Sequence, residues 1–202
     1  FITPSLTQLF GNFGANPELE PEENRTFEGG FEYALNDKFR LSGVYFNRRE
    51  ENFVFYDNIT STYGNAEGTI DAQGAEVELT WKLSEVLNLT ANYTFTERKG
   101  DEAIRIPKHK INASFGYAFA KRAFASLDYS LTGERFDTDF NTFSNVRLES
   151  YALLNAYVEY GILPQKLKIF MGVQNLLNTD YVEIIGFTTR GRNCNFGLSL
   201  SL

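Results

Sequence analysis

Few residues of this chain are suited to covalent chemistry. It contains a single His, His109, and a single Cys, Cys194, among 202 residues. Within this sequence, that excludes a metal centre built from several His or Cys ligands and an internal disulfide. A Ser-His-Asp triad would have to use His109, which stands between two lysines. Nothing in the sequence singles out a serine as the nucleophile of such a triad. We therefore predict no catalytic residue, no metal site and no cofactor, and we do not expect an enzyme.

One run of carboxylates occurs early in the chain, from Glu18 to Glu23. Carboxylates bind Ca²⁺, but a calcium-binding loop places its ligands at fixed alternate positions around a glycine. This run lacks that spacing, and its proline favours irregular backbone. We interpret the segment up to residue 23 as a solvated loop.

The residues suited to binding a ligand lie in long polar segments between apolar runs. A large polar ligand needs flat aromatic surfaces beside hydrogen-bonding and charged groups, and loop tips supply them. The candidates fall on four such segments. They are Arg105 on one loop, Phe136, Asp137 and Asp139 on the next, Phe187 and Thr189 on the last, and Tyr63 and Asn65 on the first.

Apolar and polar residues alternate along most of the chain, which is typical of strands with one apolar and one polar face. In the last of these segments Phe196 and Leu198 share one face, while Asn195 and Gly197 share the other. The pattern predicts nine strands and no helix. Their approximate ranges are 27–35, 39–56, 75–83, 87–95, 111–119, 123–131, 152–160, 167–173 and 190–202.

The connections between these strands alternate in length. Short turns are expected near residues 37, 84, 121 and 163, and long loops near 60, 101, 141 and 184. In an antiparallel meander, alternate connections lie at the same end of the sheet. Short turns at one end and long loops at the other are the arrangement of an outer-membrane barrel, with periplasmic turns and extracellular loops. We predict an all-β fold, an antiparallel transmembrane β-barrel portion.

A soluble up-and-down barrel also alternates, but it packs its apolar face inward and its strands are shorter. Eight of the nine predicted ranges have nine or more residues, as a tilted membrane strand requires. The polar face also carries many charges, which a wide aqueous lumen accommodates and which solvent would accommodate equally. They are Glu28, Glu32, Arg40, Glu76, Glu78, Lys82, Asp128, Glu159 and Lys168. The net charge of −7 and the lack of a basic stripe give no support to nucleic-acid binding.

Nine strands do not form a closed barrel by the usual rule, because single-chain bacterial barrels have an even number of strands. An open apolar sheet would leave unpaired strand edges in lipid, which is not tolerated. We therefore expect residues 1–202 to form the C-terminal part of a larger barrel.

Several short segments, in one order along the whole chain, carry a family resemblance. They are residues 1–6 (FITPSL), 16–22 (NPELEPE), 28–32 (EGGFE), 63–68 (YGNAEG) with 73–78 (QGAEVE), 106–110 (IPKHK) and 173–181 (VQNLLNTDY) closing on Gly191-Arg192. No single segment is specific, but the ordered set resembles the TonB-dependent outer-membrane receptors. Residues 9–17, 134–140, 180–181 and 186–192 resemble the cobalamin-transporting members in particular.

The resemblance implies a twenty-two-stranded barrel filled by an N-terminal plug domain, with this chain as the last nine strands. The plug and the earlier strands would lie upstream of Phe1. Receptors of this kind end on an aromatic residue, whereas this sequence ends on Leu202. The implied location is the bacterial outer membrane. The implied function is binding of a scarce nutrient at extracellular loops and its import with TonB energy, with cobalamin (vitamin B12) or a related corrinoid as the ligand.

Two alternatives stay open at this point: a receptor of the same architecture for a ferric siderophore or another nutrient, and an outer-membrane porin or enzyme. The expected partners are the nutrient ligand, outer-membrane lipid, the TonB complex through the plug, and a surface lipoprotein.

Overall fold

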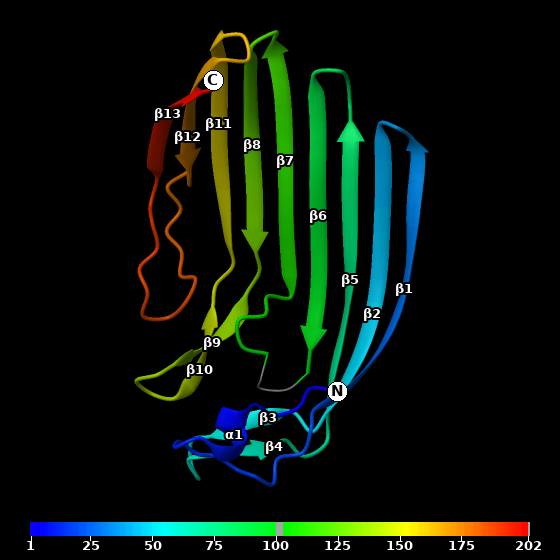
Figure 1. Ribbon diagram of the computed structural model, residues 1–202, viewed down its shortest axis with the longest axis vertical. Helices are drawn as coiled ribbons and strands as arrows, with labels where there is room; N and C mark the ends of the chain where they lie inside the picture. Colours follow the sequence, from blue (N-terminus) through cyan, green and yellow to red (C-terminus); the bar gives the residue numbers. More distant parts are fainter. Residues whose placement is uncertain (100–102, 202) are drawn as a thin grey trace. The chain divides into compact units, whose positions relative to one another are not determined.

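Nine long strands form one antiparallel sheet in the computed structural model, which describes residues 1–99 and 103–201 (Figure 1). Their order in the sheet follows their order in the chain, so each strand pairs with the next long strand, as predicted. The strands are β1 (Glu23–Asn36), β2 (Phe39–Glu51), β5 (Thr69–Lys82), β6 (Leu87–Arg98), β7 (His109–Ala120), β8 (Ala123–Thr132), β11 (Tyr151–Leu163), β12 (Leu167–Gln174) and β13 (Asn193–Leu200).

Four short strands and a short helix were not predicted. Strand β3 (Val54–Asp57) pairs with β4 (Thr62–Asn65), and β9 (Arg135–Asp139) pairs with β10 (Ser144–Leu148). The prediction of irregular long loops near residues 60 and 141 was therefore wrong in part, because each contains a short hairpin. Strands of four or five residues are too short for alternation to stand out from a polar background.

The prediction of no helix was also wrong, because α1 spans Leu6–Phe10 inside the segment expected to be a loop. Ser5 and Gln8 form a capping box: the Ser5 hydroxyl accepts from the Gln8 N–H, and the Gln8 side chain accepts from the Ser5 N–H. A single helical turn of this kind is too short to produce a helical period in the sequence. Among the described residues, no helix has the length and apolar content to cross a membrane.

The chain divides into two compact units. Unit 1 comprises Phe1–Gly29, Tyr45–Gly74 and residues 97–102, of which 100–102 lie outside the described residues. Unit 2 comprises Gly30–Val44, Ala75–Thr96 and residues 103–202. Unit 1 contains α1, β3 and β4, together with one end of each of β1, β2, β5 and β6. Unit 2 contains the larger part of the sheet and the β9–β10 hairpin.

In unit 1, one ion pair joins the ends of two sheet strands. The Nη2 atom of Arg98 lies 2.6 Å from a carboxylate oxygen of Glu50, and both side chains are largely buried. The Arg98 guanidinium also lies 5.2 Å from the centre of the Phe53 ring. A planar, always charged guanidinium suits this site, because it can pair with a carboxylate and pack on a ring together.

In unit 2, the two faces of the sheet separate as the sequence pattern predicted. Leu127 pairs with Phe115 on one side and with Ala156 on the other, so apolar side chains line up across three strands. On the opposite face Asn112 pairs with Asn92, and their side chains are hydrogen bonded at 2.9 Å. Large apolar side chains stand exposed on the apolar face. They include Tyr33, Trp81, Phe115, Leu127, Tyr129, Val158, Met171, Phe196 and Leu198.

The polar face of unit 2 holds charged residues that were expected there, among them Glu78, Asp128, Glu159 and Lys168. The Nζ atom of Lys168 lies 2.8 Å from a carboxylate oxygen of Glu159, across the β11–β12 pair. A hollow of about 480 Å³ lies over β5, β6, β7, β8 and β11. Its polar lining residues are Glu78, Thr80, Thr90, Asn92, Asn112, Ser114, Asp128, Ser130 and Asn155. A sheet with one apolar face and one charged, hydrated face is what a barrel wall between lipid and an aqueous lumen requires.

The long loops of unit 2 gather at one end of its strands, opposite the tight turns (Figure 1). The turns after β7 and β11 take two and three residues, 121–122 and 164–166. At the other end lie the β9–β10 hairpin and the loop 175–192, the last long loop. The loop predicted near residue 101 includes residues 100–102, which lie outside the described residues.

Candidate ligand-binding loops

Strand β9 has two faces with different roles. Arg135 and Asp137 are buried, with 5% and 0% of their surface exposed, whereas Phe136 between them is 49% exposed. Because side chains alternate along a strand, one face of β9 packs on neighbouring segments and the other presents an aromatic ring to solvent.

Asp137 joins three separate segments of unit 2. One carboxylate oxygen accepts hydrogen bonds from the Nε atom of Arg105 at 2.7 Å and from the Thr138 N–H at 2.9 Å. The other accepts from the N–H of Ile185 in the last long loop, at 2.9 Å. A buried carboxylate is stable only when paired and hydrogen bonded, and here both oxygens are used. Asp137 has no exposed surface for a ligand to touch.

Arg105 is held by its backbone as well as by its side chain. Its N–H donates to the Phe136 carbonyl at 2.7 Å, next to a parallel bridge between Ile104 and Phe136. Its φ of 61° is left-handed, which costs about 1–2 kcal/mol for a residue that is not glycine. The side chain remains 44% exposed. One edge of the guanidinium therefore pairs with Asp137, and the rest of the group faces solvent.

The last long loop is fixed by two further buried side chains. Arg135 donates from Nη2 to the carbonyls of Val182 and Glu183 at 2.7 and 3.0 Å. Its guanidinium also lies 5.2 Å from the centre of the Tyr151 ring. Asn175 is 4% exposed, accepts from the N–H of Thr179 at 2.8 Å and donates to the same residue's carbonyl at 2.9 Å. These hydrogen bonds pair backbone groups of the irregular loop, which in a regular strand would be paired by the neighbouring strand.

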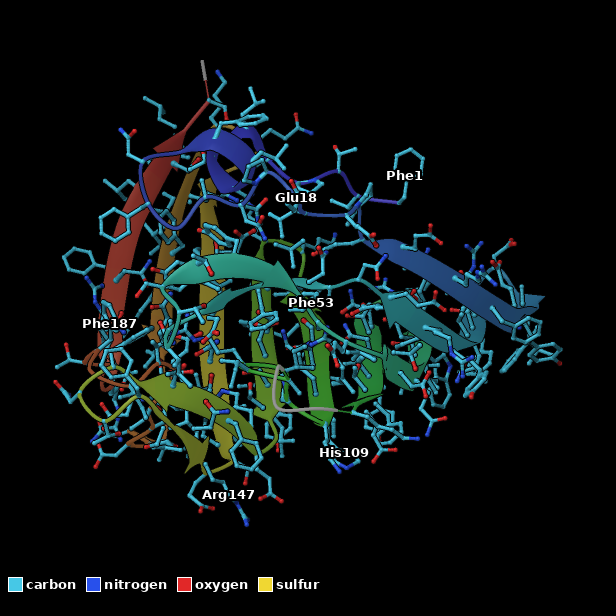
Figure 2. All side chains as sticks on the ribbon, turned by 90° about the horizontal axis from the view of Figure 1, so that it is seen from below. Phe1, Glu18, Phe53, His109, Arg147 and Phe187 are labelled. Carbon is cyan, nitrogen blue, oxygen red and sulfur yellow. The ribbon has the colours of Figure 1, made fainter. Side chains whose placement is uncertain are left out.

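The predicted residues of the last loop differ in accessibility. Phe187 is 73% exposed, and Figure 2 labels it among the side chains seen from the end where the long loops lie. Thr189 is half-buried, and its hydroxyl donates to the Tyr181 carbonyl at 2.6 Å. Phe187 is therefore free to contact a ligand, whereas the Thr189 hydroxyl proton is already used within the loop.

The β9–β10 turn adds two aromatic rings that were not among the predicted site residues. Phe140 and Phe143 are 67% and 68% exposed. The predicted residue Asp139 is half-buried at the start of this turn, where its carboxylate accepts from the Asn141 N–H at 2.8 Å and from the Asn141 side chain at 3.1 Å. The sequence offered a signal for Phe140 and Phe143, because an exposed aromatic ring in a polar loop has no packing role that would explain it.

Tyr63 and Asn65 belong to unit 1, on β4, and the other six predicted residues belong to unit 2. The Tyr63 ring packs edge-on against Tyr56, with 5.1 Å between the ring centres. The Asn65 side chain donates to the carbonyls of Glu20 and Asn52 at 3.0 and 2.7 Å and accepts from the Glu20 N–H at 2.9 Å. All of these Asn65 contacts lie within unit 1 and fasten the acidic run to β4.

Replacing Asn65 with Ala should loosen the acidic run without disturbing the rest of the chain. It removes three hydrogen bonds to backbone groups, and leaving such groups unpaired costs about 1–3 kcal/mol. Hydrogen exchange should rise at the amide of Glu20. The matched variant is Tyr63→Phe, which keeps the ring contact with Tyr56 and should leave that amide unchanged. Equal exchange in Asn65→Ala and the unaltered protein would contradict this role.

The charge state of Asp137 follows from its surroundings. Burial alone would raise the pKa of this carboxyl, but hydrogen bonds from Ile185, Arg105 and Thr138, with the positive charge of Arg105, bring the pKa below its ordinary value of 3.8. A carboxylate with a lowered folded pKa contributes stability that is present above the unfolded pKa and is lost as pH falls through the folded pKa.

We therefore expect Asp137→Asn to lower the midpoint of thermal unfolding at pH 7, and the difference from the unaltered protein to shrink below pH 3.8. Unfolding scans from pH 7 to pH 3 on both proteins measure this difference. A difference that stays constant over the whole range would show that the charge of Asp137 contributes nothing.

Within residues 1–99 and 103–201, no group of three or more His, Cys, Asp or Glu side chains is arranged to hold a metal ion. The loops of unit 2 present exposed rings and the half-exposed guanidinium of Arg105, and buried polar side chains join the loop segments. Such a surface can bind a ligand.

The fold and these loops define a segment of an outer-membrane β-barrel wall with elaborate loops at one end. Residues 1–176 match the family model described as TonB dependent receptor-like, beta-barrel. The chain belongs to this family, whose barrels lie in the bacterial outer membrane.

Solved structures of similar fold include two receptors and one transporter. The ferripyoverdine receptor of the outer membrane of Pseudomonas aeruginosa gives a TM-score of 0.76 at 21% identity, over 91% of this chain and 28% of that one. The ferric-catecholate import receptor Fiu of E. coli K12 gives 0.71 at 20% identity, over 90% and 27%. The copper transporter OprC gives 0.80 at 17% identity, over 100% and 36%. The chain thus spans about a third or less of the length of these proteins.

Proposed function

We propose that this chain is the wall and part of the ligand-binding surface of a receptor that imports an iron chelate across the outer membrane. The observation that carries the proposal is a set of exposed rings, Phe136, Phe140, Phe143 and Phe187, on loops of unit 2 that buried side chains join, together with a half-exposed Arg105 bonded to Asp137. Membership of the receptor family supplies the class of function.

An iron chelate fits this surface chemically. Catecholate and related chelators present flat aromatic rings and carry negative charge when they enclose Fe³⁺. Aromatic side chains pack on such rings, and a guanidinium attracts and hydrogen-bonds the anionic oxygens. The ligand brings its own metal, so the receptor needs no metal-binding cluster.

The sequence resemblance favoured cobalamin, and the comparisons support the alternative ligand better. The names of the similar structures mention ferripyoverdine, ferric catecholate and copper. At 17–21% identity these likenesses establish the fold alone, so the choice of an iron chelate rests on the loop chemistry and on the family. Cyanocobalamin is retained as a competitor in the test.

Import in the whole receptor would also need the rest of the barrel, a plug domain and the TonB complex, which we propose as partners of the full-length protein. A surface lipoprotein partner stays a prediction. The charged polar face of the sheet is suited to line the lumen in which a plug would lie.

The test is ligand binding to the full-length protein that contains this chain, purified in detergent and followed by calorimetry. Ferripyoverdine, a ferric catecholate, Cu²⁺ and cyanocobalamin are the probes. We expect one ferric chelate to bind and cyanocobalamin not to bind. Binding of cyanocobalamin alone would overturn the iron assignment, and binding of none of the probes by folded protein would overturn the proposal.

Phe136→Ala and Phe187→Ala locate the site. Each should weaken binding of the ferric chelate about tenfold, since a single aromatic anchor contributes about 1–2 kcal/mol. Phe119→Ala is the matched control, because Phe119 is 49% exposed like Phe136 but stands near the short turn after β7. Equal weakening by all three variants would place the site elsewhere.

A further inference from the structure

We infer that Asp137 is a positioning residue that makes three loop segments of unit 2 respond to a ligand as one body. The segments are residues 103–108, the β9–β10 hairpin and the last long loop, 175–192. The inference deepens the proposed function and rests on it for the identity of the ligand, but not for the mechanical coupling itself.

The coupling is visible in the bonds of one carboxylate. Asp137 lies on β9, its Oδ1 atom binds Arg105 in the first segment, and its Oδ2 atom binds Ile185 in the third, at 2.7 and 2.9 Å. These partners are 32 and 48 residues distant in the chain. With no exposed surface, Asp137 cannot exchange these partners for water while the loops stay folded.

The same carboxylate fixes backbone next to two of the rings proposed to contact the ligand. Phe187 stands two residues after Ile185, and its N–H is bonded to the Ile184 carbonyl at 3.2 Å, so its backbone belongs to the same tight turn. Phe136 stands one residue before Asp137 on the opposite face of β9. Asp137 therefore sets the spacing between Phe136 and Phe187 without touching a ligand.

Arg135, on the same buried face of β9, forms a second connection to the last long loop by hydrogen bonds to the carbonyls of Val182 and Glu183. Because Asp137 and Arg135 both bind residues 182–185, this part of the loop cannot move away from β9 unless the hydrogen bonds of both side chains break. A surface already ordered in this way binds with a smaller entropic cost than one that a ligand must order.

The experiment uses the full-length protein with Asp137→Asn. The amide of Asn has nearly the shape of the carboxylate, but its NH₂ group faces a donor where an oxygen accepted before. We expect hydrogen exchange at the amides of Ile185 and Arg105 to rise together, at least tenfold, in the absence of any ligand. Amides in the middle of β7 and β8 should keep their protection.

Asp139→Asn is the matched control. It lies on the same strand and undergoes the same chemical change, but its carboxylate accepts hydrogen bonds within the β9–β10 turn, from Asn141. It should leave exchange at Ile185 unchanged. Unchanged exchange at Ile185 in Asp137→Asn, or a rise at Ile185 without one at Arg105, would overturn the inference.

The affinity for the ferric chelate distinguishes coupling through Asp137 from a general loss of stability. With the ferric chelate, Asp137→Asn should weaken binding about tenfold, and Phe187→Ala should then cost much less than in the unaltered background, because both changes act on the placement of one ring. Fully additive losses would contradict coupling through Phe187. If the unaltered protein binds no chelate, the proposed function fails and the exchange data alone decide the inference.

Discussion

Leu127→Arg is expected to destabilise the folded barrel by about 2–4 kcal/mol, the range found for a basic side chain at the middle of the lipid-facing surface. Leu127 lies at the centre of β8 and is 46% exposed on the apolar face. Its cross-strand neighbours Phe115 and Ala156 offer no group that could pair with a guanidinium. The measurement is the free energy of unfolding of the full-length protein, from urea titrations in lipid vesicles.

Ser130→Arg is the matched control for Leu127→Arg. Ser130 lies three residues further along β8, on the face lined by Asp128, Asn112 and Asn155. There the new cation would meet water and a carboxylate, so the expected change is below about 1 kcal/mol. Equal losses for the two variants would contradict the assignment of the apolar face to lipid.

Asn175→Ala is expected to cost about 3 kcal/mol, because two effects add. Asn175 has a φ of 50°, in the left-handed region that Asn tolerates better than Ala. Its buried side chain also binds the backbone of Thr179 at both polar atoms and donates to the Arg190 carbonyl at 3.3 Å. Unfolding of the full-length protein and hydrogen exchange of the last long loop measure the loss.

Asn175→Gly separates the two effects. Glycine adopts the left-handed backbone freely, so only the hydrogen bonds are lost and the cost should fall to about 2 kcal/mol. Gln165→Gly is the contrasting control, because Gln165 has a φ of 60° in an exposed short turn where its side chain has no comparable role. That change should be neutral or slightly stabilising. A cost for Asn175→Gly as small as for Gln165→Gly would refute the role of the side-chain bonds.

The sheet was predictable from the sequence because its strands repeat every two residues over long runs. The ranges 87–95 and 111–119 fall inside β6 and β7, and their apolar sets share one face as expected. The strand ends were less well predicted. The second strand was predicted to extend to residue 56, but β2 ends at Glu51. The next residue, Asn52, has a φ of 57°, which interrupts the extended backbone.

The candidate site was predictable only in part. Exposed rings such as Phe136 and Phe187 could be selected by residue type, because a ring in a polar loop stands out. The role of Asp137 could not be predicted, since its burial depends on partners 32 and 48 residues away in segments of irregular backbone. Arg135, Phe136 and Asp137 do alternate in character, and that short pattern was the available signal for β9.

The ligand was the least predictable feature for a related reason. The segments that suggested cobalamin, such as residues 134–140 and 186–192, lie in the β9–β10 hairpin and in the last long loop. Loops vary most among proteins that share a scaffold, so short similarities there say little about the ligand. The match to the receptor family extends over residues 1–176, strands and loops together, and it identifies the family but not the ligand.

The most direct test of the whole account is uptake of radioactive iron, supplied as the ferric chelate that binds best, by cells in which the full-length protein is the only outer-membrane route for it. The account predicts uptake that disappears when TonB is inactivated and falls severalfold with Phe136→Ala and Phe187→Ala, while Phe119→Ala takes up iron normally. Uptake that continues without TonB, or no uptake by correctly inserted protein, would contradict it.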